Sequence, residues 1–228
     1  MPALGFGSLS PVQRKTTMNN TMTQREVTVH LVDDDESVLH SQLELLTAAG
    51  ISVETFSSAE AFISSLTPHS AGCVVTDLKM SGMSGLDLQR KLVASNSTLP
   101  LIVVSGHANV PTTVEVMENG AITLLQKPYD ANEFLDAVQR GLDQFIENHE
   151  RATELNSIHE RLDSLSEGEM SVLRLMIAGR PNKVISTELE ISMRTVDRRR
   201  SIVLEKMQVD SAPELARLVT LIEAGPAS

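Results

Sequence analysis

Short apolar runs alternate with helical patterns over residues 27–128, and this alternation restricts the possible fold more than any other feature. Five apolar runs rich in Val, Ile and Leu lie at 27–32, 51–56, 73–76, 101–105 and 122–126. Helical patterns lie between them at about 36–48, 58–66, 84–94 and 111–119, and another begins at 131. Five strands that alternate with five helices predict an α/β, doubly wound, five-stranded parallel sheet buried on both faces.

From residue 165 onward the pattern is purely helical. SEGE at 166–169 fits a capping box, and Gly179 supplies a stop. A second helix is expected at about 182–189, and Ser192 can cap a third that runs to about residue 207. SAPE at 211–214 fits another capping box, and it opens a helix with an apolar face made of Leu215, Leu218, Val219 and Ile222. Four short helices predict a small all-α domain.

Charge and composition divide the chain into four regions. Residues 25–145 carry 6 basic and 16 acidic side chains, whereas 165–228 carry 9 of each, as expected for two domains with different partners. Residues 1–24 are polar and lack periodicity, so we expect a disordered leader there, with Met18 or Met22 as alternative starts. Residues 146–164 are expected to form a helical linker. The pattern at 131–163 allows one continuous, dimerising helix of about 50 Å, or a packed helix followed by a solvated linker.

Several classes of protein are excluded by the composition. No stretch approaches the roughly 18 apolar residues that a membrane helix needs, and no secretory signal is visible. The one cysteine, Cys73, cannot form an internal disulfide, which fits the cytoplasm, and its apolar surroundings indicate a small buried side chain. We therefore expect a cytoplasmic protein that does not span a membrane.

Acidic residues gather where two of the expected strands end. Asp33, Asp34 and Asp35 follow the first strand and Asp77 follows the third, so they should meet at the carboxyl edge of the sheet. Carboxylates in one crevice repel one another unless a cation is present, and Mg²⁺ suits an oxygen site of this kind. Ser105 and Lys127 end the fourth and fifth strands. Taken singly these residues are more often turn, cap or solvated residues, but together they form a plausible set for phosphoryl transfer.

Residues 27–145 resemble the receiver domain of bacterial two-component response regulators. The resemblance rests on VDDDE, VVTDLKMSGMSG, VVSGHANV and LLQKPY, each at the end of an expected strand. It implies that Asp77 accepts a phosphoryl group from a sensor histidine kinase. It further implies that Asp34, supported by Asp33, holds Mg²⁺ together with Asp77 and the backbone carbonyl of Lys79. Lys127 would contact the phosphoryl oxygens, Ser105 would move to hydrogen-bond them, and the Lys127 to Pro128 peptide would be cis.

Two positions depart from the receiver pattern. Leu124 stands where an aromatic partner of the hydroxyl switch is usual, and Ser81 stands where a proline usually follows the acceptor. Neither change removes a chemical group of the site. The resemblance therefore does not extend to the coupling of Ser105 to an aromatic side chain, while phosphorylation is still expected.

The basic residues of the helical half are concentrated in SMRTVDRRRSIVLEK, at 192–206. Charge alone favours a solvated helix face there. The longer stretch that begins LSEGEMSVL and contains PNKVISTELEISMRTV resembles the LuxR-type helix-turn-helix domain. The resemblance implies a recognition helix at 193–207 in which base edges are reached by Asp197, Arg198 and Ser201. The DNA backbone would be held by Lys183, Arg194, Thr195 and Arg199.

Two further departures affect these DNA contacts. Gly168 stands where the LuxR-type family usually has a basic residue, and Arg199 stands where it often has histidine. The phosphate contacts are therefore expected to be redistributed. The last helix would form the dimer surface in the family, although its apolar face can also be simple core.

We interpret the chain as a phosphorylation-dependent, DNA-binding transcriptional regulator. Phosphorylation of Asp77 would favour a homodimer that binds paired promoter half-sites in double-stranded DNA. One alternative is a phosphate-independent transcription factor with a vestigial receiver, which Leu124 leaves open. Another is an aspartyl-phosphate phosphatase resembling the haloacid dehalogenase group, but that group needs a second acid where this chain has Lys79. Beyond phosphoryl transfer and autodephosphorylation, no enzyme activity is expected. The kinase, the operator, the sign of regulation and the dimer face are not encoded in any motif.

Overall fold

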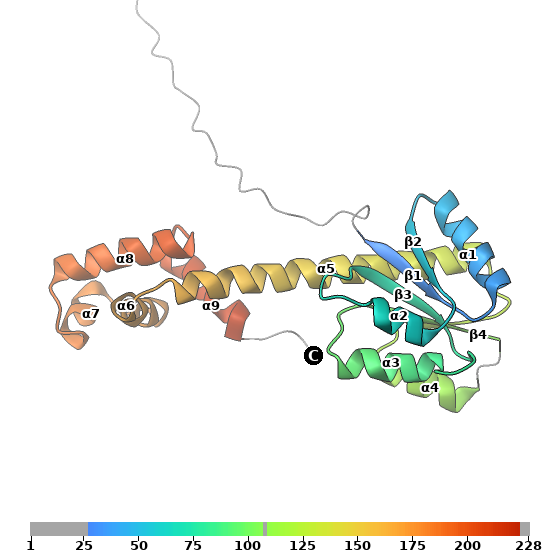
Figure 1. Ribbon diagram of the computed structural model, residues 1–228. Helices are drawn as coiled ribbons and strands as arrows, with labels where there is room; N and C mark the ends of the chain where they lie inside the picture. The colour runs from blue at the N-terminus through green and yellow to red at the C-terminus, as the bar shows by residue number, and fades with distance from the viewer. Residues whose placement is uncertain (1–26, 107–108, 224–228) are drawn as a thin grey trace, which may run out of the picture.

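The structure is a computed structural model of the 228-residue chain, and it describes residues 27–106 and 109–223 (Figure 1). The expected disordered leader at 1–24, with its alternative starts, lies outside the described residues.

A parallel sheet forms the centre of the first half of the chain. Its five strands run in the order β2-β1-β3-β4-β5, and all four pairings are parallel. The strands are β1 (Thr28–Val32), β2 (Ser52–Phe56), β3 (Gly72–Asp77), β4 (Leu101–Ser105) and β5 (Thr123–Gln126). Every residue of β3 and β4 is buried, as expected for strands covered on both faces. The predicted doubly wound sheet is confirmed.

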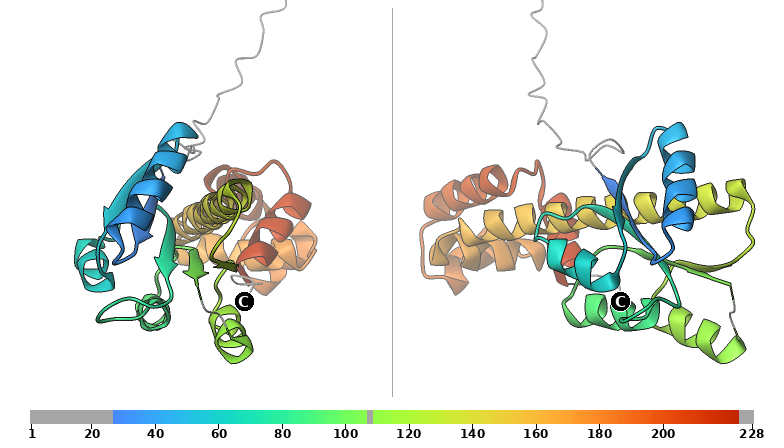
Figure 2. Two further views of the ribbon diagram at one scale, coloured as in Figure 1. Left: turned by 90° about the vertical axis from the view of Figure 1, so that its right-hand side faces the viewer. Right: turned by 45° about the vertical axis from the view of Figure 1, so that its right-hand side comes forward.

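Helices cover both faces of this sheet (Figure 2). One face carries α1 (Glu36–Ala48) and α5 (Ala131–Asp163), and the other carries α2 (Ala59–Ser65), α3 (Gly85–Ala94) and α4 (Val110–Glu118). Helix α5 lies close to the central strands because Gly141 has no side chain: a Cβ there would be 3.1 Å from Cβ of Cys73. Cys73 is fully buried, as expected, and burial raises the pKa of its thiol to about 12.

Helix α5 joins the two halves of the molecule without a break (Figure 1). Its 33 residues correspond to about 50 Å, so the predicted continuity of the helix at 131–163 is confirmed, while its use in dimerisation stays a prediction. Phe145 belongs to the core beneath the sheet and Ile158 to the core of the helical half, while residues 147–154 between them are exposed. The last turns of α5 are thus part of the second core.

Four helices complete the second half: α6 (Glu167–Ile177), α7 (Asn182–Glu188), α8 (Met193–Met207) and α9 (Ala212–Glu223). The predicted capping box at Ser166 is present in full, and Ser192 caps α8 as expected. Only one of the two hydrogen bonds of the capping box predicted at Ser211 is present. Ser211 Oγ accepts from the Glu214 N–H at 3.4 Å, but the Glu214 carboxylate accepts from the N–H of Asp210, one residue earlier than predicted.

The apolar face of α9 lies against the second core. Leu215 and Val219 are buried, and Leu218 and Ile222 pack against the same cluster. The apolar pattern of this helix is therefore explained by packing within the domain. None of the helices described by the structure is both long enough and apolar enough to span a membrane.

Candidate functional site

Two aspartates and one lysine meet at the carboxyl edge of the sheet. Nζ of Lys127, which follows β5, lies 3.0 Å from Oδ2 of Asp33 and 2.7 Å from Oδ1 of Asp77. The Asp33 and Asp77 side chains are only 5% and 10% exposed. Strands β1 and β3 are neighbours although β2 separates them in sequence, so the site lies where the strand order reverses. Ligand sites of open α/β sheets form at this kind of switch point.

Burial and hydrogen bonding shift the pKa values of these residues in opposite directions. Burial alone lowers the pKa of Lys127, but its hydrogen bonds to Asp77 and Asp33 together raise that pKa above the usual lysine value. Burial raises the pKa of Asp33, and hydrogen bonds from the Asp35 N–H and Lys127 only partly oppose the change. The Lys127 ammonium is thus the counter-charge of both buried carboxylates.

The backbone around Asp77 fixes the position of its carboxylate. The N–H of Lys79 donates to Oδ2 of Asp77 at 2.6 Å. Helix α3 begins against the same residue, because a Cβ on Gly85 would lie only 2.2 Å from the Asp77 carbonyl oxygen. The approach of α3 therefore requires glycine at position 85.

The other two aspartates of the run have different partners. Asp34 is exposed, and its Oδ2 accepts hydrogen bonds from Ser81 N–H at 2.7 Å and from Ser81 Oγ at 2.6 Å. These bonds lower the pKa of Asp34. Asp35 caps α1 by accepting from the N–H of Ser37 at 2.9 Å. The three adjacent carboxylates thus have different contacts: Asp33 pairs with a lysine, Asp34 joins two loops and Asp35 caps a helix.

Ser105 and the segment around Lys127 complete this edge. Ser105 is 1% exposed, and its carbonyl accepts from the Lys127 N–H at 2.8 Å. The Lys127 to Pro128 peptide is cis, as predicted. Leu124 is half-buried in β5 and is the register partner of Val103 in β4.

A helix-turn-helix lies in the second half of the chain. Helices α7 and α8 are joined by a short turn at residues 189–192, and buried Ile185 and Val196 pack in their common core. On α8, Arg194, Asp197, Arg198 and Ser201 are exposed, whereas Thr195 and Arg199 are half-buried; Lys183 on α7 is exposed. The predicted recognition helix at 193–207 is therefore a helix with most of its candidate contacts at the surface.

Two candidate DNA contacts interact within the domain. Asp197 Oδ1 accepts from Nδ2 of Asn182 at 2.6 Å, which ties the start of α7 to α8. The guanidinium of Arg199 lies over Gly168 in α6, where an added Cβ would be 2.7 to 2.9 Å from its atoms. Gly168, the departure noted in the sequence, is thus the position that makes room for Arg199.

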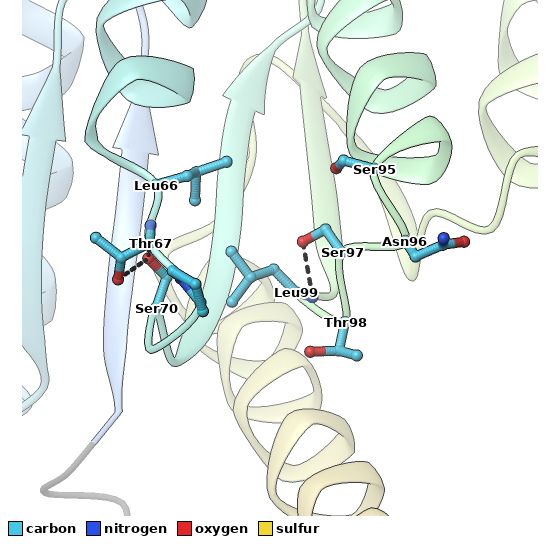
Figure 3. Close-up of a pocket in the computed structure, with 9 residues that line it drawn as sticks. Leu66, Thr67, Ser70, Ser95, Asn96, Ser97, Thr98 and Leu99 are labelled. Atoms are coloured by element: carbon cyan, nitrogen blue, oxygen red, sulfur yellow. Dashed lines mark hydrogen bonds between the residues drawn. The ribbon is translucent and has the colours of Figure 1, made fainter.

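A pocket of about 500 Å³ lies away from the carboxylates (Figure 3). It is bounded by the loops at 66–70 and 95–99, which precede β3 and β4 and so lie at the amino edge of the sheet. Its lining is mostly Ser, Thr and Asn, and none of the candidate catalytic residues borders it.

Known proteins share both halves of this architecture. Residues 29–139 match the response regulator receiver domain, and residues 163–219 match the LuxR family of bacterial regulatory proteins. The transcriptional regulatory protein FixJ of Rhizobium meliloti (strain 1021) is 39% identical over 88% of this chain and 98% of its own length. The response regulator protein TmoT of Ectopseudomonas mendocina is 35% identical over 86% of this chain and 90% of its own.

This chain belongs to the response regulators. Among solved structures, response regulator StyR aligns with a TM-score of 0.79 at 38% identity, covering 85% of this chain and 98% of that one. Full-length FixJ from B. japonicum aligns at 0.55 with 34% identity, covering 88% and 98%. A receiver domain joined to a LuxR-type DNA-binding domain makes this response regulator a transcriptional regulator, as the sequence predicted.

Receiver domains generally bind Mg²⁺ at the phosphorylation site, and the donors of this response regulator suit that ion. The carboxylate oxygens of Asp33, Asp34 and Asp77, and the backbone carbonyl of Lys79 in the loop after β3, are groups of the kind that Mg²⁺ binds. In the part of the chain that the structure describes, however, no three His, Cys, Asp or Glu side chains are arranged as a ready metal site. Asp34 is directed to Ser81, and the other two carboxylates share Lys127.

The structure also identifies residues that sequence reasoning did not include in either site. Ser81 was treated only as a departure, yet it makes two bonds to Asp34. Asn182, at the start of α7, was not selected, although its amide orients Asp197. A serine in a loop, or an asparagine in the first turn of a helix, carries no signal in the sequence for a partner 47 or 15 residues away.

Proposed function

We propose that Asp77 of this response regulator accepts a phosphoryl group from a sensor histidine kinase, and that the modification controls dimerisation and promoter binding. The observation that supports this most strongly is the pairing of Asp77 with Lys127 at the switch point of the sheet. The Asp77 carboxylate is positioned by a backbone N–H and an ammonium group, and phosphoryl transfer depends mainly on positioning and charge neutralisation.

In the proposed step, a carboxylate oxygen of Asp77 bonds to phosphorus as the bond from phosphorus to the kinase histidine nitrogen breaks. Mg²⁺, when bound through Asp33, Asp34, Asp77 and the Lys79 carbonyl, would neutralise charge that develops on the phosphoryl oxygens. Lys127 would then contact a phosphoryl oxygen instead of the free carboxylate, and the Ser105 hydroxyl would donate a hydrogen bond to another. Water would later attack phosphorus, release inorganic phosphate and restore the Asp77 carboxylate. We propose no chemistry of the receiver beyond this transfer and autodephosphorylation.

The proposed DNA contacts lie on α8 and its neighbours. Arg198 is exposed in the middle of α8 and would pair with guanine, while Asp197 and Ser201 would reach neighbouring base edges. Lys183, Arg194, Thr195 and Arg199 would contact phosphates. Two copies of the domain in a homodimer would bind paired half-sites. Since its partner is double-stranded DNA, we expect the protein in the cytoplasm.

We propose residues 25–145 and 165–228 as the two domains, with 146–164 as the helical linker. The exposed stretch at 147–154 supports a spacer function for the first part of this linker. Leu124 keeps one alternative open, a regulator whose receiver no longer responds to phosphate, because a leucine cannot act as the aromatic partner of Ser105.

Incubation with acetyl phosphate and Mg²⁺ tests the acceptor, with the mass of the intact protein as the readout. We expect wild type to gain one phosphoryl group, Asp77→Asn to gain none, and Asp136→Asn, an exposed residue of α5, to behave as wild type. Undiminished modification of Asp77→Asn would overturn the assignment. Footprinting with and without acetyl phosphate distinguishes the proposed regulator from one with a vestigial receiver. The proposed regulator would protect DNA more strongly with acetyl phosphate, whereas a vestigial receiver would give the same protection in both conditions.

A further inference from the structure

Ser81 connects the loop after β3 to the loop after β1. Both of its donors, the backbone N–H and the side-chain hydroxyl, bind the same oxygen of Asp34, at 2.7 and 2.6 Å. The two residues are 47 positions apart in sequence, and both are exposed. The contact therefore crosses the open rim of the carboxylate site, beside the candidate acceptor.

A proline, which is usual at position 81, can make neither of these bonds, because it has no N–H and no hydroxyl. A carboxylate held by two charge-assisted hydrogen bonds loses part of that stabilisation when it turns to a new partner. The new partner would be the metal ion, because Asp34 is a proposed ligand. Among the described residues, the Asp34 carboxylate does not form a metal site together with Asp33 and Asp77.

We propose that Ser81 is a latch that holds Asp34 away from the metal site, so that position 81 sets the affinity of this receiver for a divalent cation. This inference rests on the proposed function, which requires Asp34 to become a metal ligand. Ser81 is a positioning residue in this scheme: it acts through Asp34 and contacts neither the metal nor the phosphoryl group. Both hydrogen bonds go to Oδ2, and a turn of the Asp34 carboxylate toward Asp33 and Asp77 would break them.

Thr and Val provide a matched pair of variants at this position. They have the same shape and the same restricted rotamers, but only Thr retains the hydroxyl donor. The full-length protein is titrated with MgCl₂ by isothermal calorimetry as wild type, Ser81→Thr and Ser81→Val. We expect Ser81→Thr to bind like wild type and Ser81→Val to bind about tenfold more tightly, the effect of losing one net hydrogen bond to a carboxylate.

A role in stability alone predicts a different pattern. If Ser81 only joins the two loops, Ser81→Val lowers the melting temperature equally with and without Mg²⁺, and its dissociation constant equals that of Ser81→Thr. If Ser81 is a latch, Ser81→Val lowers the melting temperature without Mg²⁺, and saturating Mg²⁺ removes the difference.

Equal or weaker Mg²⁺ binding by Ser81→Val, with wild-type binding intact, would overturn the latch and leave the proposed function in place. An Asp34→Asn variant separates the two ideas. If wild type binds Mg²⁺ and Asp34→Asn binds it equally well, Asp34 is not a ligand, and both the proposed metal set and the latch are wrong.

Discussion

The Nζ atom of Lys127 lies 2.7 Å from Oδ1 of Asp77, at the edge where the first and third strands end. The same ammonium group is 3.0 Å from Asp33, so one cation is shared by two carboxylates whose charged forms burial disfavours. In the mechanism proposed above, the group that stabilises the unmodified site also contacts a phosphoryl oxygen on Asp77. Stability and reactivity would then depend on the same side chain.

Replacement of Lys127 by methionine should therefore destabilise the protein. The change keeps most of the volume but leaves Asp33 and Asp77 without their counter-charge. Loss of one partner of a buried pair is costly, but Lys127 is 26% exposed, so we expect a loss of about 2 kcal/mol in the free energy of unfolding. Urea denaturation without divalent cations measures it. Lys91→Met, at an exposed site on α3, serves as control and should change stability by less than about 0.5 kcal/mol.

Replacement of Gly85 by alanine should be more damaging. The new Cβ would lie 2.2 Å from the Asp77 carbonyl oxygen, and backbone on both sides prevents an easy adjustment. We expect a loss of more than about 2 kcal/mol in unfolding free energy. Gly106→Ala is the control, because a Cβ there meets nothing within 4 Å. Equal stability of the two variants in urea would show that the start of α3 is not held against the acceptor.

A buried histidine gives the receiver a pH-dependent stability. His30 is 6% exposed and packs against the rings of Phe56 and Phe62, with centroids 6.2 and 5.5 Å away. Glu54 Oε2 lies 3.3 Å from its Nδ1 but without hydrogen-bond geometry. Burial lowers the pKa of His30, and Glu54 only partly offsets this change.

Acid should therefore weaken the fold through His30. Below about pH 6.5 the unfolded chain takes up a proton that the folded His30 resists, so the free energy of unfolding falls as pH decreases. Between pH 7.5 and 5 we expect wild type to lose about 1 kcal/mol more than His30→Gln in urea denaturation. His40→Gln, which alters an exposed histidine of α1, should retain the wild-type pH dependence. A steep loss that persists in His30→Gln would assign the effect to other groups.

The sequence predicted the elements and the chemical groups of the receiver site because each has a local signal. The strand expected at 101–105 is observed at Leu101–Ser105, since a run of β-branched residues between polar segments can be buried in few other ways. The convergence of Asp77 and Lys127 follows from the rule that parallel strands end at one edge. Proline permits a cis peptide at Pro128, but the prediction that this bond is cis came from the family resemblance.

Contacts between loops could not be predicted in this way. The bond between Asp34 and Ser81 depends on the conformations of two loops whose sequences allow many. The continuity of α5 was one of two alternatives, because residues 147–154 have no apolar face to choose between them. The helix is held at both ends by packing, because Phe145 lies in the core of the receiver and Ile158 lies in the core of the helical half.

The last prediction concerns Gly168 and Arg199. The Arg199 guanidinium lies over Gly168, where an added Cβ would be 2.7 to 2.9 Å from its atoms. Gly168→Ala should therefore displace the guanidinium while the domain stays folded, because only the flexible end of Arg199 must move. If Arg199 contacts a phosphate from this position, Gly168→Ala and Arg199→Ala should each weaken DNA binding.

Salt dependence measures this effect without knowledge of the operator, since phosphate contacts do not depend on sequence. A plot of log affinity against log salt concentration on random duplex DNA has a negative slope. We expect this slope to become shallower by about 0.9 for Arg199→Ala, because one phosphate contact is lost. The Gly168→Ala variant should show a smaller change of slope. The double variant should match Arg199→Ala, because both substitutions affect the same contact between Arg199 and a phosphate. Additive losses in the double variant would show instead that Gly168 affects DNA binding independently of Arg199.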